Sequence, residues 1–218
     1  MQYVKNIYIT VSLLIAIFFL QHLLYANKDS LGKDCLRAPL LFTEKKEGLK
    51  VIFLDIDGVL NSYNYMDVLY LKGERSTAEE KSTPALDPQA VENLRIIVER
   101  TGAKIVVTSN WRNKGLQWIQ ELWKQNRLPG NVIDITPQRR NRVFEIRRWL
   151  KSKHVENYVV LDDDFTDIEV RMIGVAHFVD IHPKYGLRED DVRNAAKLLN
   201  SKDSAVPELN SRASLRSI

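Results

Sequence analysis

Asp55 follows directly on the apolar run VIFL, and Asp57 comes two residues later, just before Gly58. Like charges this close repel each other, so the pair needs either a cation to neutralise it or a proton shared within it. A second acidic group, which begins with Asp162 and Asp163, follows the apolar run YVVL. Oxygen ligands in an open site suit Mg²⁺ that shares its shell with a substrate phosphate. The acidic residues therefore indicate metal-assisted chemistry on a phosphate.

Hydroxyl and guanidinium groups also occur just after a predicted strand or at the start of a predicted helix. Thr108 and Ser109 follow the apolar run IVV, and Arg140 and Arg142 stand at the start of a predicted helix. A hydroxyl and an arginine that face a carboxylate cluster can hold the phosphate oxygens that a metal ion leaves free. These residues are the candidates for substrate binding.

The elements that must position these residues are strands alternating with helices. Apolar runs predict five strands, at 49–56, 103–109, 131–136, 157–164 and 176–181. Helical periodicity predicts helices at 87–102, 115–126, 142–153 and 188–200. Such alternation predicts an α/β fold with right-handed crossovers, a mainly parallel five-stranded sheet and helices on both faces. Ligands bind at the carboxyl ends of strands in such sheets, so the two acidic groups should converge there.

Three motifs together resemble those of the haloacid dehalogenase (HAD) superfamily of phosphohydrolases. They are DIDGVLN at 55–61, IVVTS at 105–109 and LDDD at 161–164. More narrowly, TSNWR, EIRRWL, YVVLDDD and YGLREDD resemble the Swiss-army-knife RNA-repair-associated HAD group. The resemblance covers about residues 50–200 and implies a three-layer Rossmann-like (HAD-like) fold.

The resemblance also implies roles for the acidic residues. Asp55 would be the nucleophile that takes up the phosphoryl group as an aspartyl-phosphate. Asp57 would protonate the leaving oxygen and then activate water. Mg²⁺ would be held by Asp55, by the backbone carbonyl of Asp57, and by Asp162 and Asp163, directly or through water.

The same resemblance implies the residues that contact the phosphate. Thr108 would hydrogen-bond the transferring phosphoryl group, with Ser109 as the alternative. Arg142 would be the cationic stabiliser, with Arg140 as the rival. A lysine is commoner at this position in the superfamily, but an arginine also supplies charge and two donors.

The segment 61–86 stands where many HAD enzymes insert a cap domain, and here it is long enough for a flap but not for a folded lid. The site should therefore be open to large substrates. Three functions fit: a Mg²⁺-dependent phosphomonoester hydrolase acting on nucleic-acid ends or nucleotides, a membrane-anchored phosphoprotein phosphatase, or a non-catalytic HAD-like binding module. The four tryptophans, Trp111, Trp118, Trp123 and Trp149, have helical spacings that indicate packing rather than base stacking.

The remaining chain divides by composition. Residues 1–27 contain an uncharged apolar segment, 7–25, which as a helix would span about 28 Å, close to the hydrocarbon thickness of a bilayer. It is either a single-pass membrane anchor or a cleaved signal segment that would make the domain secreted or periplasmic. Lysines and arginines after the segment favour a cytoplasmic domain for the anchored form.

Residues 28–48 have the polar composition of a linker, 49–200 form the HAD-like domain, and 201–218 have the composition of a disordered tail. The single cysteine, Cys35, excludes an internal disulfide framework, and the net charge of +4 favours anionic partners weakly. The expected partners are a phosphorylated substrate, which includes nucleic acid, and a membrane through residues 7–25; nothing indicates a protein partner.

Overall fold

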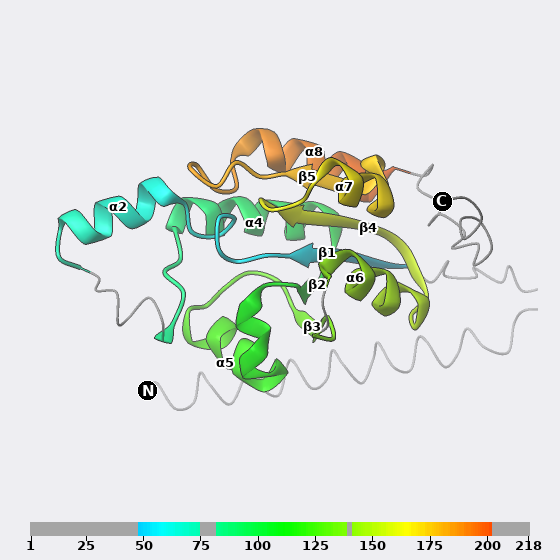
Figure 1. Ribbon diagram of the computed structural model, residues 1–218, viewed down its shortest axis with the longest axis horizontal. Coiled ribbons are helices and arrows are strands. Elements are labelled where there is room, and N and C mark those ends of the chain that lie inside the picture. Colours follow the sequence, from blue (N-terminus) through cyan, green and yellow to red (C-terminus); the bar gives the residue numbers. More distant parts are fainter. Residues whose placement is uncertain (1–47, 75–81, 139–140, 202–218) are drawn as a thin grey trace, which may run out of the picture. The chain divides into compact units, whose positions relative to one another are not determined.

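Five parallel strands form a sheet in the computed structural model, which describes residues 48–74, 82–138 and 141–201 (Figure 1). The strands are β1 (Leu49–Leu54), β2 (Lys104–Val107), β3 (Val132–Ile135), β4 (Val155–Asp162) and β5 (Phe178–Asp180). Their order across the sheet is β3-β2-β1-β4-β5. The predicted α/β fold is confirmed, and the sheet is parallel throughout rather than mainly parallel.

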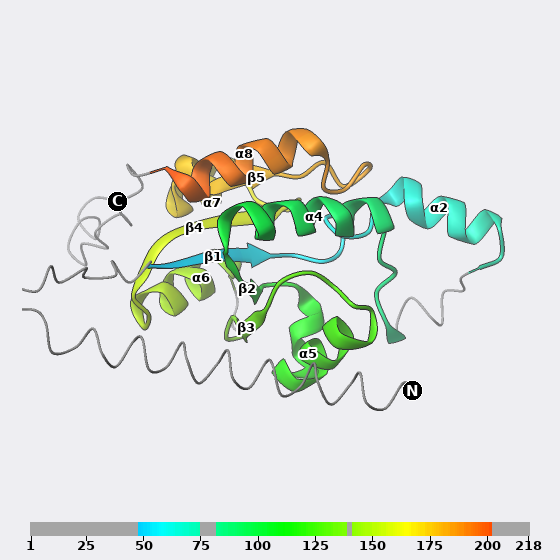
Figure 2. The same cartoon turned by 180° about the vertical axis from the view of Figure 1, so that it is seen from behind.

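Helices cover both faces of this sheet, as the predicted three-layer Rossmann-like fold requires (Figures 1 and 2). The helices α4 (Pro88–Thr101), α5 (Leu116–Gln125) and α8 (Glu189–Asn200) contribute to one core cluster, and α6 (Arg142–Lys151) and α7 (Asp167–Ile173) contribute to the other. Successive residues of a strand point to opposite faces. In β1, Ile52 and Leu54 therefore lie in the first cluster, whereas Val51 and Phe53 lie in the second.

The register of the central strands aligns their ends. Leu54 of β1 pairs with Val107 of β2 and with Leu161 of β4. The residues that follow these three are consequently neighbours at the carboxyl edge of the sheet, which is the edge where ligands bind in such folds.

Local signals explain where the helices begin and end. Asp87 accepts a hydrogen bond from the backbone N–H of Gln89 and caps α4, and Gly102 ends that helix with φ of 67°. The start of helix α7 is marked by a capping box, which is visible in the sequence as Thr166 followed three residues later by Glu169.

The segment 61–86 contains helix α2 (Tyr63–Leu71), and its described part contains no folded cap domain. Figure 1 shows α2 beyond the carboxyl end of β1, and none of its residues is buried. A flap at this position was expected, and the described part of it is one short helix.

Within the described ranges, no helix has the length and apolar character needed to cross a bilayer. The predicted membrane segment at 7–25, nearly all of the linker and the tail lie outside those ranges.

Candidate functional site

Three aspartates meet at the carboxyl ends of β1 and β4. Asp55 is buried, Asp162 is fully buried at 0% exposure, and Asp163 is half-buried. One carboxylate oxygen from each lies within 4.8 Å of the others. The backbone N–H of Asp55 also donates to the carbonyl of Leu161 at 3.0 Å, which joins the two strand ends. The predicted convergence of the two acidic groups is confirmed.

The cluster is electrostatically unfavourable as a set of anions. Burial, and then the charge of Asp55, raises the pKa of Asp162 to about 7. Burial and the same charge raise the pKa of Asp163 to about 6. Three carboxylates this close together are stabilised by a bound cation, and their oxygen ligands fit a hard divalent cation such as Mg²⁺. These aspartates could therefore hold the metal ion that the sequence indicated.

Arg142 is the cation that the described chain itself brings to this cluster. It is the first residue of α6, whose N-cap is Asn141. Its Nη1 atom donates to Asp55 Oδ2 at 2.6 Å and to Asp162 Oδ2 at 2.5 Å. Burial alone would lower the pKa of Arg142, but the two carboxylates outweigh it and hold the pKa above its ordinary value. The rival residue, Arg140, lies outside the described residues.

Asp57 is exposed, and its carboxylate is held from two sides. Asn61 Nδ2 donates to Oδ1 and Trp111 Nε1 donates to Oδ2, both at 2.9 Å. Gly58 follows with φ of 76°, and a Cβ atom at that position would lie 2.2 Å from Asp163 Oδ2. Only glycine therefore allows the chain to turn between the two acidic groups. The cluster of three carboxylates does not include Asp57.

The two candidate hydroxyls differ in their partners. The Thr108 hydroxyl is buried and has no hydrogen-bond partner among the described residues. Ser109 Oγ accepts a hydrogen bond from the backbone N–H of Trp111 at 3.5 Å and caps the short 3₁₀ helix Asn110–Lys114. Buried hydroxyls are normally hydrogen-bonded, so the unused capacity of Thr108 fits a bound group at this strand end.

A buried ion pair beside Thr108 was missed in the sequence. Arg112 Nη2 donates to Glu145 Oε2 at 2.7 Å, and Arg112 Nη1 donates to the carbonyl of Thr108. Glu145 lies one turn after Arg142 on α6, so this pair connects the end of β2 to the helix that carries the cation. The signal in the sequence was a carboxylate on the apolar face of this helix, four residues before Trp149.

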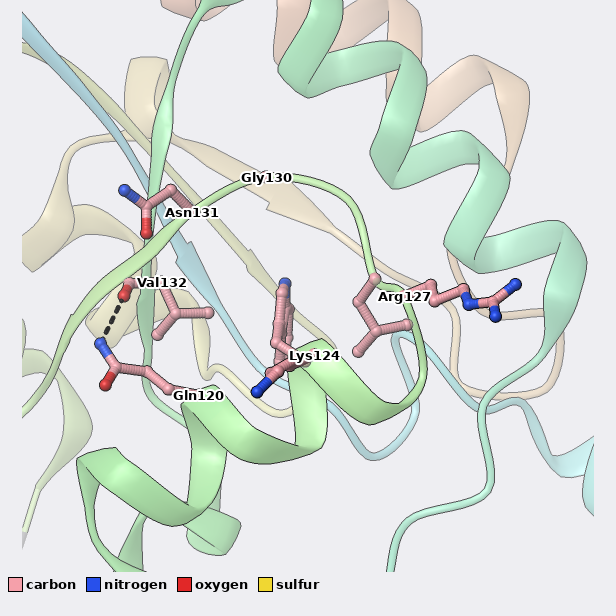
Figure 3. Close-up of a pocket in the computed structure, with 8 residues that line it drawn as sticks. Gln120, Lys124, Arg127, Gly130, Asn131 and Val132 are labelled. Carbon is pink, nitrogen blue, oxygen red and sulfur yellow. Dashed lines mark hydrogen bonds between the residues drawn. The ribbon is translucent and has the colours of Figure 1, made fainter.

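An open cavity of about 460 Å³ lies at this edge of the sheet. Asp55, Asp57, Asn110, Arg142 and Asp163 are among its lining residues, whereas Thr108, Ser109 and Asp162 lie buried behind it and do not line it. A different cavity, of about 390 Å³, lies between the end of α5 and the start of β3 (Figure 3). Its lining contains Lys124 and Arg127 but none of the clustered aspartates. The candidate site is therefore the cavity at the carboxyl edge of the sheet.

A family model for the HAD domain in Swiss Army Knife RNA repair proteins matches residues 51–192. The match begins within β1 and extends into α8, so it includes each of the site residues described above. Comparisons with curated proteins and with solved structures give no match. Because the family model spans well over half of the 218 residues, the chain belongs to the family of HAD domains in Swiss Army Knife RNA repair proteins.

Proposed function

We propose that this domain is a Mg²⁺-dependent phosphomonoester hydrolase that acts through an aspartyl-phosphate on Asp55, with nucleic-acid ends or nucleotides as substrates. The observation that carries the proposal is the convergence of Asp55, Asp162 and Asp163 with Arg142 at one open cavity. Members of HAD families are usually phosphohydrolases, and the RNA-repair context of this family favours a nucleic-acid substrate.

The residues divide the chemistry between them. Asp55 Oδ1 accepts the backbone N–H of Ile56 at 2.7 Å, and this hydrogen bond, with the contact from Arg142, fixes the carboxylate for attack on phosphorus. As the oxygen–phosphorus bond forms on Asp55, the bond to the leaving oxygen breaks and Asp57 supplies the proton that this oxygen needs. Asp57 then takes a proton from water, which attacks phosphorus and releases Asp55.

Charge must be neutralised throughout these steps, because phosphoryl transfer depends mainly on positioning and electrostatic stabilisation. A Mg²⁺ ion held by Asp55, Asp162 and Asp163, and by the carbonyl of Asp57, would withdraw charge from the phosphoryl oxygens. Arg142 would stabilise a second oxygen. The Thr108 hydroxyl has no partner within the described ranges, which supports its assignment as the donor to the phosphoryl group in preference to Ser109.

The open cavity and the lack of a folded cap in the described part of 61–86 support a substrate larger than a metabolite. The decisive experiment is a Mg²⁺-dependence assay of the full chain on 3′-phosphorylated oligonucleotides, 5′-mononucleotides and phosphopeptides. We expect hydrolysis of the nucleic-acid substrates, its loss with EDTA, and its loss in Asp55→Asn.

Asp190→Asn is the matched control, because Asp190 is an exposed residue of α8 far along the chain from the site residues of β1. Activity that persists in Asp55→Asn would contradict the covalent mechanism. A preference for phosphopeptides would instead favour a phosphoprotein phosphatase.

We also propose that residues 7–25 anchor the chain in a membrane with the domain on the cytoplasmic side. The support is the uncharged apolar composition of this segment and the lysines and arginines that follow it. Protease protection in sealed membrane vesicles tests the orientation, and release of the protein by alkaline extraction would contradict the anchor.

A further inference from the structure

A second cavity, of about 340 Å³, lies directly beside the catalytic one. The two cavities share Asp57, Gly58 and Tyr63 among their lining residues. Its volume falls in the range of about 300–1,000 Å³ that is usual for small-molecule sites. Asp57 is the residue proposed to donate a proton to the leaving oxygen. The cavity of about 340 Å³ therefore begins on the side of the site where the leaving group must lie.

One face of α2 forms a wall of this cavity. Tyr63, Met66, Asp67 and Tyr70 line it, and their spacing of three, four and seven residues places them on the same side of the helix. None of the residues of α2 is buried, so these rings are not part of the hydrophobic core. An aromatic face that packs in no core and borders a reactive carboxylate fits ligand binding.

Trp111 lines the cavity together with these residues of α2 and is held in a fixed orientation. Its indole N–H donates to Asp57 at 2.9 Å, and its ring stacks on Trp118 with centroids 5.8 Å apart and an interplanar angle of 8°. The ring is thus preorganised beside the carboxylate that would protonate the leaving oxygen. Flat aromatic side chains of this kind are the usual platforms for nucleobases.

The charged residues that line the cavity limit the chemical class of ligand that it can bind. Among the described residues, those that line it include Asp57 and Asp67 but no lysine, arginine or histidine. Lys114 Nζ lies 5.3 Å from the centre of the Trp111 ring but does not line the cavity. The two carboxylates that do line it disfavour a second phosphate, whereas the amino group of a base can donate a hydrogen bond to a carboxylate. An esterified tyrosine ring has no such donor, so the lining favours a nucleobase over a phosphotyrosine side chain.

We propose that this aromatic pocket, formed by one face of α2 and by Trp111, binds the terminal nucleoside whose oxygen leaves in the reaction. The base stacks on the aromatic side chains, the sugar oxygen faces Asp57, and the phosphate lies in the neighbouring catalytic cavity. This inference rests on the proposed function and adds to it a subsite that would distinguish ends with a terminal base from ends without one.

The test compares ligands with and without that base. The full chain carrying Asp55→Asn is titrated by calorimetry, in Mg²⁺, with a 3′-phosphorylated dinucleotide and with its counterpart that has an abasic terminal sugar. We expect the base to tighten binding about tenfold, within the range usual for stacking of one base on an aromatic ring. Adding Tyr70→Ala should remove most of this difference.

Tyr65→Ala is the matched control, because Tyr65 is also a half-buried tyrosine of α2 but does not line the pocket. It should leave the preference for the base intact. The proposal is overturned by equal affinities for the two ligands, by no measurable binding of either, or by equal effects of the two tyrosine substitutions. Tighter, Tyr70-dependent binding of a phosphotyrosine peptide would also overturn the nucleobase assignment.

Hydrolysis by the chain with Asp55 intact separates this proposal from the proposed function. Equal Mg²⁺-dependent hydrolysis of the two ligands would support the phosphatase and refute the pocket. Base-dependent binding without any hydrolysis would support the pocket and refute the phosphatase.

Discussion

Breaking the Arg112–Glu145 pair should destabilise the domain far more than breaking an exposed ion pair. The two side chains are only 6% and 1% exposed, and Arg112 Nε already has no partner among the described residues. Glu145→Leu would leave the buried guanidinium with its hydrogen bond to the Thr108 carbonyl and without the carboxylate that balances its charge. Removing one partner of a buried pair typically costs about 3–5 kcal/mol. That is a large share of the roughly 5–15 kcal/mol that stabilises a whole domain.

Urea unfolding followed by tryptophan fluorescence measures this cost. The matched control is Glu92→Leu, which breaks the Arg95–Glu92 pair, whose side chains are 39% and 54% exposed. It should change the free energy of unfolding by no more than about 1 kcal/mol. The double variant Arg112→Met/Glu145→Leu should recover most of the lost stability, because two apolar side chains can replace a buried pair at little cost.

Turnover should behave differently from stability. The double variant, unlike Glu145→Leu alone, loses the contact between Arg112 and the Thr108 carbonyl, so its activity should be low although its stability returns. Two results would refute this reasoning: a loss below about 1 kcal/mol in Glu145→Leu, or a double variant no more stable than the single one.

Three further predictions concern the site itself. The pKa of Asp162 is raised to about 7 and that of Asp163 to about 6. In the absence of metal, the folded state therefore binds more protons than the unfolded state between these values and the ordinary pKa of about 4. The free energy of unfolding in EDTA should consequently fall as pH rises from about 4 to about 7. Mg²⁺ should stabilise the protein most above that interval, and thermal denaturation with a flat or rising profile in EDTA would contradict this. Thr108→Val should raise the stability of the substrate-free domain by about 1 kcal/mol, because it removes a buried hydroxyl without a described partner, yet lower turnover about 100-fold. A loss of both stability and activity would argue for a purely structural threonine. Arg142→Met should tighten Mg²⁺ binding about tenfold in calorimetry, because it removes a competing cation beside Asp55, and it should lower turnover. Weaker Mg²⁺ binding would show that Arg142 helps to order the metal ligands.

The sequence predicted the sheet and the convergence of the acidic groups because both depend on short-range patterns. Apolar runs of strand length identified the positions of all five strands. Because ligands bind at the carboxyl ends of such strands, the same runs predicted that Asp55, Thr108 and Asp162 lie together. The start and end of α4 were equally visible, because Asp87, Pro88 and Gly102 act within one turn of the helix ends.

Contacts between distant parts of the chain could not be predicted in this way. Arg112 and Glu145 are 33 residues apart, and nothing local shows that their side chains meet. Helix α2 was not predicted, because it buries no residue and its sequence lacks the amphipathic periodicity of a helix that packs against a core. The tryptophan spacings indicated packing, which is confirmed for the buried Trp123 and Trp149 and for Trp111 and Trp118, which pack partly buried against the first core cluster. Trp111 also lines a cavity, which the spacing did not show.

The alignment of Leu54 with Val107 and Leu161 places Asp55, Thr108 and Asp162 immediately after one rung of the sheet. The relative positions of these three residues are thus set by the lengths and the register of three strands. One extra residue within β1 would shift Asp55 by about 3.3 Å and turn its side chain to the opposite face. The lengths of β1, β2 and β4 should therefore be fixed to the residue.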